Sequence, residues 1–291
     1  AVLGVFHRSR GLALGLTLAG TAVAQIVVGP LGNWLIVAFG WRAAFVWLGL
    51  GWGAVTFVLC LLFFFDARDR PSRRPPGHGA PHAALAGLST AQALRDSALW
   101  RLAVSNFVVM ALTIGLTIHI FPILTEAGVS RASAGWLISL AGGAAIVGKL
   151  VTGWLLDRYR PNWVGGMTLA AGALAFLLLW EGISSPALIV VAMVVNGYAG
   201  GSKTQITGFL TASYGGMRNF GKIYGVMAAL MAAAAGAGPL LGGLSYDRFG
   251  SYEPFLLAGA AGCLLGGLLM LTMPRYPAWE AEKQDGAPSL A

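Results

Sequence analysis

Long apolar runs separated by short polar connections constrain this chain more than any other feature. A helix needs about 20 apolar residues to cross the roughly 30 Å hydrocarbon core of a bilayer, and eight stretches of the sequence meet that need. Only 10% of the 291 residues are charged, whereas a soluble domain carries about 25%. We therefore expect an all-α polytopic membrane protein embedded in the lipid bilayer. The eight predicted transmembrane helices are residues 12–38, 43–65, 102–125, 132–156, 162–180, 182–205, 223–246 and 254–274.

The net charge of +8 comes mainly from Lys and Arg in the connections between these runs. An even number of spans places both ends of the segment on one side. That side then holds fourteen Lys and Arg residues, and the other side holds three, Arg42, Arg131 and Arg248. Because cytoplasmic loops are enriched in Lys and Arg, we expect both ends to be cytoplasmic in a multi-pass protein of the cell inner (plasma) membrane. The charge is not gathered on one polar face, so no nucleic-acid partner is expected. Abundant Arg and Ala with little Lys favour a bacterial source.

The one long connection, residues 66–97, is rich in Pro, Gly and Arg. His78 and His82 lie there without a Cys or acidic residue at metal-ligand spacing, so we interpret them as solvated and expect no metal. The later part, "STAQALRDS", is predicted to form a short surface helix. The sequence contains no nucleophile–base pair, HExxH motif, dinucleotide motif or phosphate loop, so we expect no catalytic residues and no cofactor.

A weak internal repeat indicates that the chain is part of a longer protein. Residues 10–45 resemble residues 220–255 at positions where backbone geometry favours Gly or Pro. Four predicted spans precede the second copy, within residues 98–217, and none precedes the first. We therefore expect about 120 further residues, forming four helices, upstream of this segment. The matched pairs include Gly11 with Gly221, Gly15 with Gly225, Gly40 with Gly250, and Pro30 with Pro239.

Four motifs resemble those of the major facilitator superfamily. They are "GWLLDRYRP" (153–161), "GAGPLLGG" (236–243), "VVGPLGNW" (27–34) and "FGWRAAF" (39–45). The resemblance implies helices five to twelve of a twelve-helix fold, that is, an N-terminally truncated major facilitator fold. Within that superfamily, "GLTIHIFPILTEAGVS" and "GKLVTGWLLDR" are similar to monocarboxylate and oxalate–formate type porters, whose eighth helix usually carries Arg where this chain has Lys149.

This resemblance also implies the organisation of the chain. Residues 1–65 would be the last two helices of the N-terminal six-helix half, and residues 66–97 the cytoplasmic loop between halves. Residues 98–274 would be the complete C-terminal half, and residues 275–291 a cytoplasmic tail. We expect the full-length protein to be monomeric.

Lys149 is the first candidate for contact with a solute. It lies about five residues past the middle of the span 132–156, which is otherwise uncharged. A charge near the bilayer centre costs about 3 kcal/mol on insertion scales, so the ammonium should face the bundle interior and bind an anion such as a carboxylate. The alternative is a lysine that snorkels to the cytoplasmic interface, which lies roughly 10 Å away at about 1.5 Å per residue.

A second polar group lies in "NGYAGGSKTQITG" (196–208). Lys203, Gln205 and Asn196 are predicted to form a substrate-binding cluster, with snorkelling as the alternative for Lys203. Gly197 and Gly201 form a GxxxG step that allows close helix packing.

His119, in "LTIHIFPIL", is the third candidate. Its imidazole titrates near neutral pH and can bind solute or transfer protons, and in the resembling family this helix lines the central cavity. The alternative is a structural hydrogen bond to a neighbouring helix.

The gating candidates are Gly153, Asp157, Arg158 and Pro239. The resemblance implies that Asp157 pairs with a helix N-terminus or a basic partner in one conformation and releases it in another. The alternative is a solvated turn. Pro239 would kink its helix near mid-membrane.

The sequence thus predicts a secondary active transporter that moves a small organic anion, similar to a monocarboxylate, by alternating access. The alternatives are a transporter of another small solute such as a drug or sugar, or a non-transporting membrane sensor. No Asp or Glu lies inside the eight predicted spans. If protons are the coupling ion, the acid lies in the upstream helices or His119 replaces it.

Overall fold

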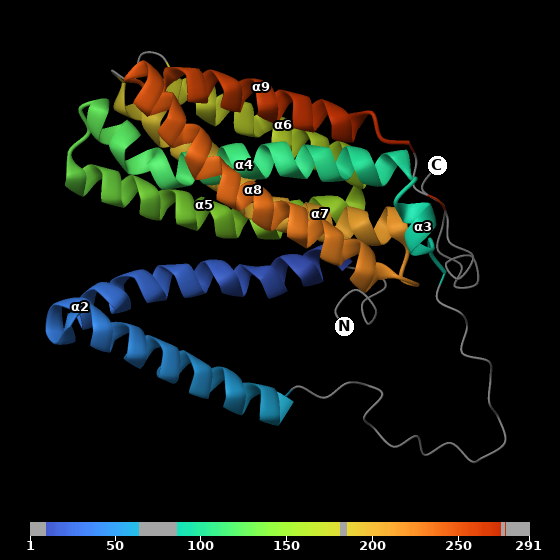
Figure 1. Ribbon diagram of the computed structural model, residues 1–291, viewed down its shortest axis with the longest axis horizontal. Helices are drawn as coiled ribbons and strands as arrows, with labels where there is room; N and C mark the ends of the chain where they lie inside the picture. Colours follow the sequence, from blue (N-terminus) through green and yellow to red (C-terminus); the bar gives the residue numbers. More distant parts are fainter. Residues whose placement is uncertain (1–9, 64–85, 181–184, 275–276, 278–291) are drawn as a thin grey trace. The chain divides into compact units, whose positions relative to one another are not determined.

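A computed structural model describes residues 10–63, 86–180, 185–274 and 277. Every regular element in these ranges is a helix (Figure 1), and one isolated bridge joins Gly87 to Gly216. The predicted all-α class is therefore confirmed. The helices are α2 (Arg10–Phe63), α3 (Thr90–Ala93), α4 (Ser97–Glu126), α5 (Arg131–Arg158), α6 (Pro161–Trp180), α7 (Pro186–Gly215), α8 (Phe220–Phe249) and α9 (Glu253–Leu271).

Six helical stretches in the described ranges are long and apolar enough to cross a membrane, where the sequence predicted eight. The predicted span 12–38 is helical, and so is residue 186 onward in the predicted span 182–205, but neither span belongs to these six. Polar residues around Lys203 lower the hydropathy of α7, and the described stretch Gly11–Thr21 is a shorter apolar helix. The six are Trp34–Leu62, Ser97–Glu126, Ser133–Arg158, Pro161–Trp180, Phe220–Phe249 and Glu253–Leu271.

The chain divides into two compact units. Residues 23–83 belong to one, and residues 2–22 with 84–291 belong to the other. In the first, the connection between the predicted spans 12–38 and 43–65 is a single break inside α2 at Gly40, with φ 77° and ψ 161°. Only a residue without a Cβ adopts this conformation readily, so one glycine separates the two helical arms (Figure 1).

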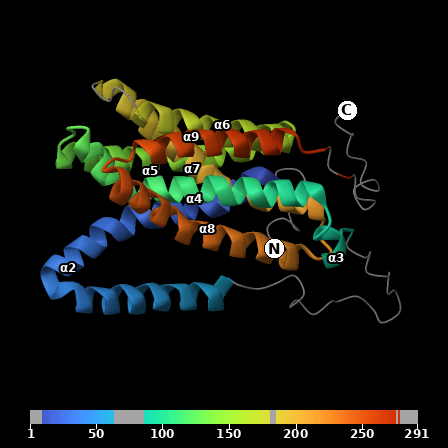
Figure 2. The same cartoon turned by 45° about the horizontal axis from the view of Figure 1, so that its top comes forward.

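In the second unit, the most extensive helix pairs are α6 with α9, α5 with α7, and α4 with α8, and α6 runs beside α9 in both views (Figures 1 and 2). Glycines set the spacing of these pairs. A Cβ at Gly197 would lie 2.1 Å from the Ala141 carbonyl oxygen, and one at Gly201 would lie 2.4 Å from that of Ala145. The GxxxG step therefore lets α7 pack with its backbone directly on α5, as predicted.

A short helix precedes α4, as the sequence predicted. Ser89 caps α3 by accepting a hydrogen bond from the Gln92 amide, and the Gln92 side chain accepts from the Ser89 amide in return. This reciprocal capping box satisfies two amides that the helix itself cannot pair. The interpretation of His78 and His82 as solvated concerns residues outside the described ranges, as do predictions for the rest of the loop 66–85 and for the tail 275–291 apart from residue 277.

Candidate functional site

The amino end of α2 packs against the carboxyl half of α5 through glycines. A Cβ at Gly11 would lie 2.4 Å from the Gly153 carbonyl oxygen, and a Cβ at Gly15 would lie 2.6 Å from that of Lys149. Gly153, a predicted gating residue, has the matching constraint, because its Cβ would lie 2.6 Å from the Gly11 carbonyl oxygen. All three positions therefore require glycine for this helix contact.

Asp157 caps the amino end of α2. Its two carboxylate oxygens accept hydrogen bonds from the amides of Gly11 (2.6 Å) and Leu12 (2.9 Å). The first amides of a helix have no intrahelical acceptor, and they carry partial positive charge that favours an anion. The structure thus places Asp157 at a helix N-terminus, as expected. Arg158 does not join this contact, since its exposed guanidinium lies 5.5 Å from the centre of the Trp154 ring on its own helix.

Lys149 reaches across to α2. Its ammonium donates to the Leu18 carbonyl (3.0 Å) and to the Thr21 hydroxyl (2.8 Å), and the residue is only 9% exposed. This direction differs from that of a lysine snorkelling along its own helix. Both acceptors are neutral, and within the described ranges the ammonium makes no ion pair. One of its three N–H donors is left for another group.

Lys203 is held between α7 and α4. It is 6% exposed, and its ammonium donates to the Thr113 hydroxyl. One turn further along α7, the Thr207 hydroxyl donates to the Asn106 side-chain oxygen at 2.6 Å. These contacts form a buried polar network that links the two helices.

The predicted cluster of Lys203, Gln205 and Asn196 is not formed. Lys203 points to α4, whereas Gln205 points to α2 and donates to the Gly11 carbonyl at 2.8 Å. Residues two apart on a helix do not share a face, which explains the separation of these two. Asn196 is half-buried and makes no hydrogen bond to any residue that the structure describes.

Several polar residues of the site were not predicted from the sequence. The hydroxyls of Thr152 and Ser202 are 2.9 Å apart and join α5 to α7, and Thr113, Thr207 and Asn106 join α4 to α7. Hydroxyl and amide side chains inside apolar spans are the signal that indicates such bonds, but the residues of one span do not reveal which partner helix they face.

His119 forms the structural bond that was the alternative reading. Its Nε2 lies 3.0 Å from the Pro239 carbonyl oxygen, which can only accept, so Nε2 carries the hydrogen. Its Nδ1 then accepts from the Tyr252 hydroxyl at 3.3 Å. Burial, helped by the nearby Glu126 carboxylate, raises the pKa of Tyr252, so its hydroxyl remains a donor. His119 thus links α4 with α8, and Pro239 lies within α8 as its acceptor.

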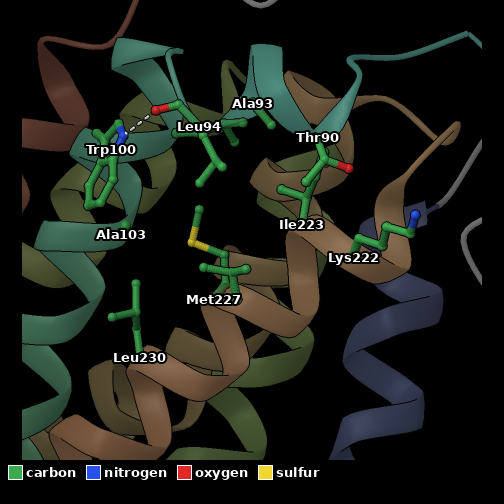
Figure 3. A pocket seen from close by; sticks show the side chains of 11 residues that line it. Thr90, Ala93, Leu94, Trp100, Ala103, Lys222, Ile223, Met227 and Leu230 are labelled. Carbon is green, nitrogen blue, oxygen red and sulfur yellow. Dashed lines mark hydrogen bonds between the residues drawn. The ribbon is translucent and has the colours of Figure 1, made fainter.

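An apolar pocket lies elsewhere, where α3 and the first turns of α4 face α8 (Figure 3). The Trp100 indole closes one side and donates to the Leu94 carbonyl at 2.8 Å. Met227 and Leu230 line the other side, and the ammonium of Lys222 points away from the hollow. This pocket presents no inward cation, so the candidate site for an anion remains with Lys149 and Lys203.

The chain is similar to known membrane transporters over most of its length. A family model described as Major Facilitator Superfamily matches residues 2–126 and 106–290. The chain is 28% identical to the MFS transporter asaE of Aspergillus flavus over 94% of its length. It is 28% identical to monocarboxylate transporter 12 of Rattus norvegicus over 88% of its length, and 29% identical to monocarboxylate transporter 11 of Homo sapiens over 93%. The chain spans only 60%, 58% and 58% of these relatives' own lengths, respectively.

Proposed function

We propose that this chain, which belongs to the Major Facilitator Superfamily, forms part of a secondary active transporter that moves a small organic anion by alternating access. All three relatives are named transporters, and two are named monocarboxylate transporters. Transport rather than enzymatic chemistry is therefore the activity that these similarities support. A solute similar to a monocarboxylate is the finer part of the proposal.

The observation that carries the proposal is the buried ammonium of Lys149. Its two acceptors are a carbonyl and a hydroxyl, and it has no carboxylate partner among the described side chains. A buried charge is costly unless an opposite charge pairs with it. The carboxylate of a solute would supply that charge, and Lys203, also buried and bonded to a neutral hydroxyl, would add a second positive potential.

The acidic and basic side chains of this segment bear on whether protons are the coupling ion. The predicted spans contain no Asp or Glu, and His119 is already bonded on both ring nitrogens. Exchange of one anion for another needs no protein acid, whereas proton coupling needs a proton carrier, either His119 or an acid outside the predicted spans. We favour exchange.

In this proposal Asp157, with Gly153 beside it, forms the inner gate. Residues 1–65 would belong to one six-helix half and residues 98–274 to the other. Residues 66–97 and both ends of the segment would lie on the cytoplasmic side of a bacterial inner membrane.

Substitution of Lys149 in the complete protein, reconstituted into liposomes, tests the proposal. Lys149→Gln and Lys149→Leu should abolish uptake of labelled monocarboxylates, whereas Lys149→Arg should retain part of it because the positive charge remains. Lys222→Gln is the matched control, because Lys222 is exposed on α8 and its ammonium points away from the pocket. Wild-type uptake by Lys149→Leu, or uptake of a neutral sugar in place of the acid, would refute an anion contact.

A further inference from the structure

Gln205 occupies the point where α2, α5 and α7 meet. Its side chain is fully buried, and its Nε2 donates to the Gly11 carbonyl at 2.8 Å. Glycines on the two facing helices make room for the amide. A Cβ at Gly153 would lie 2.6 Å from Nε2, and a Cβ at Gly15 would lie 3.2 Å from it.

The residue that Gln205 holds is the same one that Asp157 caps. The Gly11 amide donates to Asp157 of α5, and the Gly11 carbonyl accepts from Gln205 of α7. Two side chains from two helices thus grip one residue at the amino end of α2. A motion that carries this end away from α5 and α7, which pack on each other, must break both contacts.

The grip is incomplete in one respect. The Gln205 Oε1 atom is buried and has no hydrogen-bond partner among the described residues. A buried acceptor without a partner is unfavourable, and water that enters when the helices separate would satisfy it. The unpaired oxygen therefore favours release, which suits a contact that must form and break repeatedly.

We propose that Gln205 is a positioning residue of the inner gate, which clamps the amino end of α2 together with Asp157, and is not a contact for the solute. This inference rests on the proposed transport function, because a gate has a role only in a molecule that alternates between two states. The sequence predicted Gln205 as part of a substrate-binding cluster, and the clamp is a different role.

Gln205→Glu makes this clamp sensitive to pH. A protonated glutamate can donate its hydroxyl to the Gly11 carbonyl, as the amide does. An ionised glutamate has no donor and places negative charge against that carbonyl and near Asp157. The other charged groups nearby are Lys149 of α5 and Lys203 on α7 itself, whose ammonium groups bond to α2 and to α4, while the Arg10 side chain lies outside the described residues. Gln205→Leu cannot titrate and is the matched control.

The measurement is the distance between spin labels in the complete protein, held in lipid nanodiscs. Labels on Leu16→Cys and Val151→Cys, both exposed positions, report the separation of α2 from α5 when the exposed Cys60 is replaced by Ser. In Gln205→Glu, we expect the ratio of open to closed molecules to rise about tenfold from low to high pH, beyond any change in the wild type and in Gln205→Leu. The same distances at both pH values would overturn the proposal.

Gln205→Asn serves if the glutamate variant does not fold. It keeps the amide but is one methylene too short to reach Gly11, so hydrogen exchange of the amides in residues 12–18 should rise about threefold to tenfold. Thr211→Val, at another buried α7 position, should leave this exchange unchanged. Unchanged exchange in Gln205→Asn would also refute the clamp.

The distance measurement separates this inference from the proposed function. A pH-dependent distance in a protein that moves no carboxylate would leave the clamp standing and remove the anion. Variants that alter the apparent affinity for the solute while the distances stay fixed would show that Gln205 contacts the solute, and the clamp would be wrong.

Discussion

Replacing Asp157 by alanine should loosen the amino end of α2 and slow transport more than it weakens solute binding. The carboxylate holds two amides, at 2.6 and 2.9 Å, at the positive end of a helix. Both bonds are to a charged group, and both lie away from Lys149, the proposed solute contact. The expected defect is therefore in the conformational step.

The size of the effect follows from these two bonds. A hydrogen bond to a charged group contributes about 1.5 kcal/mol or more, and the charge at the helix end adds about 0.5 kcal/mol. Because Asp157 is only half-buried, we reduce the sum of these values, about 3.5 kcal/mol, to about 3 kcal/mol. The closed state should lose about a hundredfold in population relative to the open state. Asp157→Asn keeps one acceptor oxygen and should lose about tenfold.

The assay combines transport kinetics with the label distance across α2 and α5. Asp157→Ala should lower the maximal rate while the solute concentration for half-maximal rate changes less than about threefold, as expected for a residue that does not bind the solute. Asp247→Ala is the control, because Asp247 lies in a similar Asp-Arg turn at the other end of the bundle and is exposed. An unchanged rate and distance in Asp157→Ala would show that Asp157 sits in a passive turn.

Three further predictions concern the helix contacts. His119→Phe keeps an aromatic ring but removes the donor to the α8 carbonyl, so we expect a loss of about 1 kcal/mol in stability, and an unchanged thermal unfolding temperature would contradict it. Gly197→Ala should force α7 away from α5 and cost about 2 kcal/mol, whereas Gly200→Ala, with open space at its Cβ, should be tolerated in the same unfolding measurement. Gly40→Ala must adopt φ 77°, at a cost of about 1–3 kcal/mol, and should lower the yield of monodisperse protein, while equal yields from Gly40→Ala and the helical Gly49→Ala would refute this.

The sequence predicted well whatever depends on neighbouring residues in the chain. Hydropathy located six of the spans, and the resemblance around Asp157 implied a helix N-terminus or a basic partner, of which the structure shows the first. The spans follow from local composition, which the fold does not change, whereas the partner of Asp157 follows from the resemblance.

The rotation of each helix could not be predicted in the same way. Helices that meet lipid and protein on different sides are apolar nearly all round, so periodicity gives little information on facing. Lys203 and Gln205 were therefore grouped together, although one reaches α4 and the other α2. The partner of His119 on α8 likewise depends on contacts between segments more than 100 residues apart in sequence.

The glycines at Gly11, Gly15 and Gly153 have a mechanical consequence for the contact between α2 and α5. Interlocking side chains resist sliding until they repack, whereas two helix backbones in direct contact at glycines have no side chains to repack. Resistance to sliding between α2 and α5 then comes from a few hydrogen-bonding side chains instead of many apolar contacts. Single substitutions can change that resistance, so the rate at which α2 moves along α5 can evolve while the rest of the two helices stays the same.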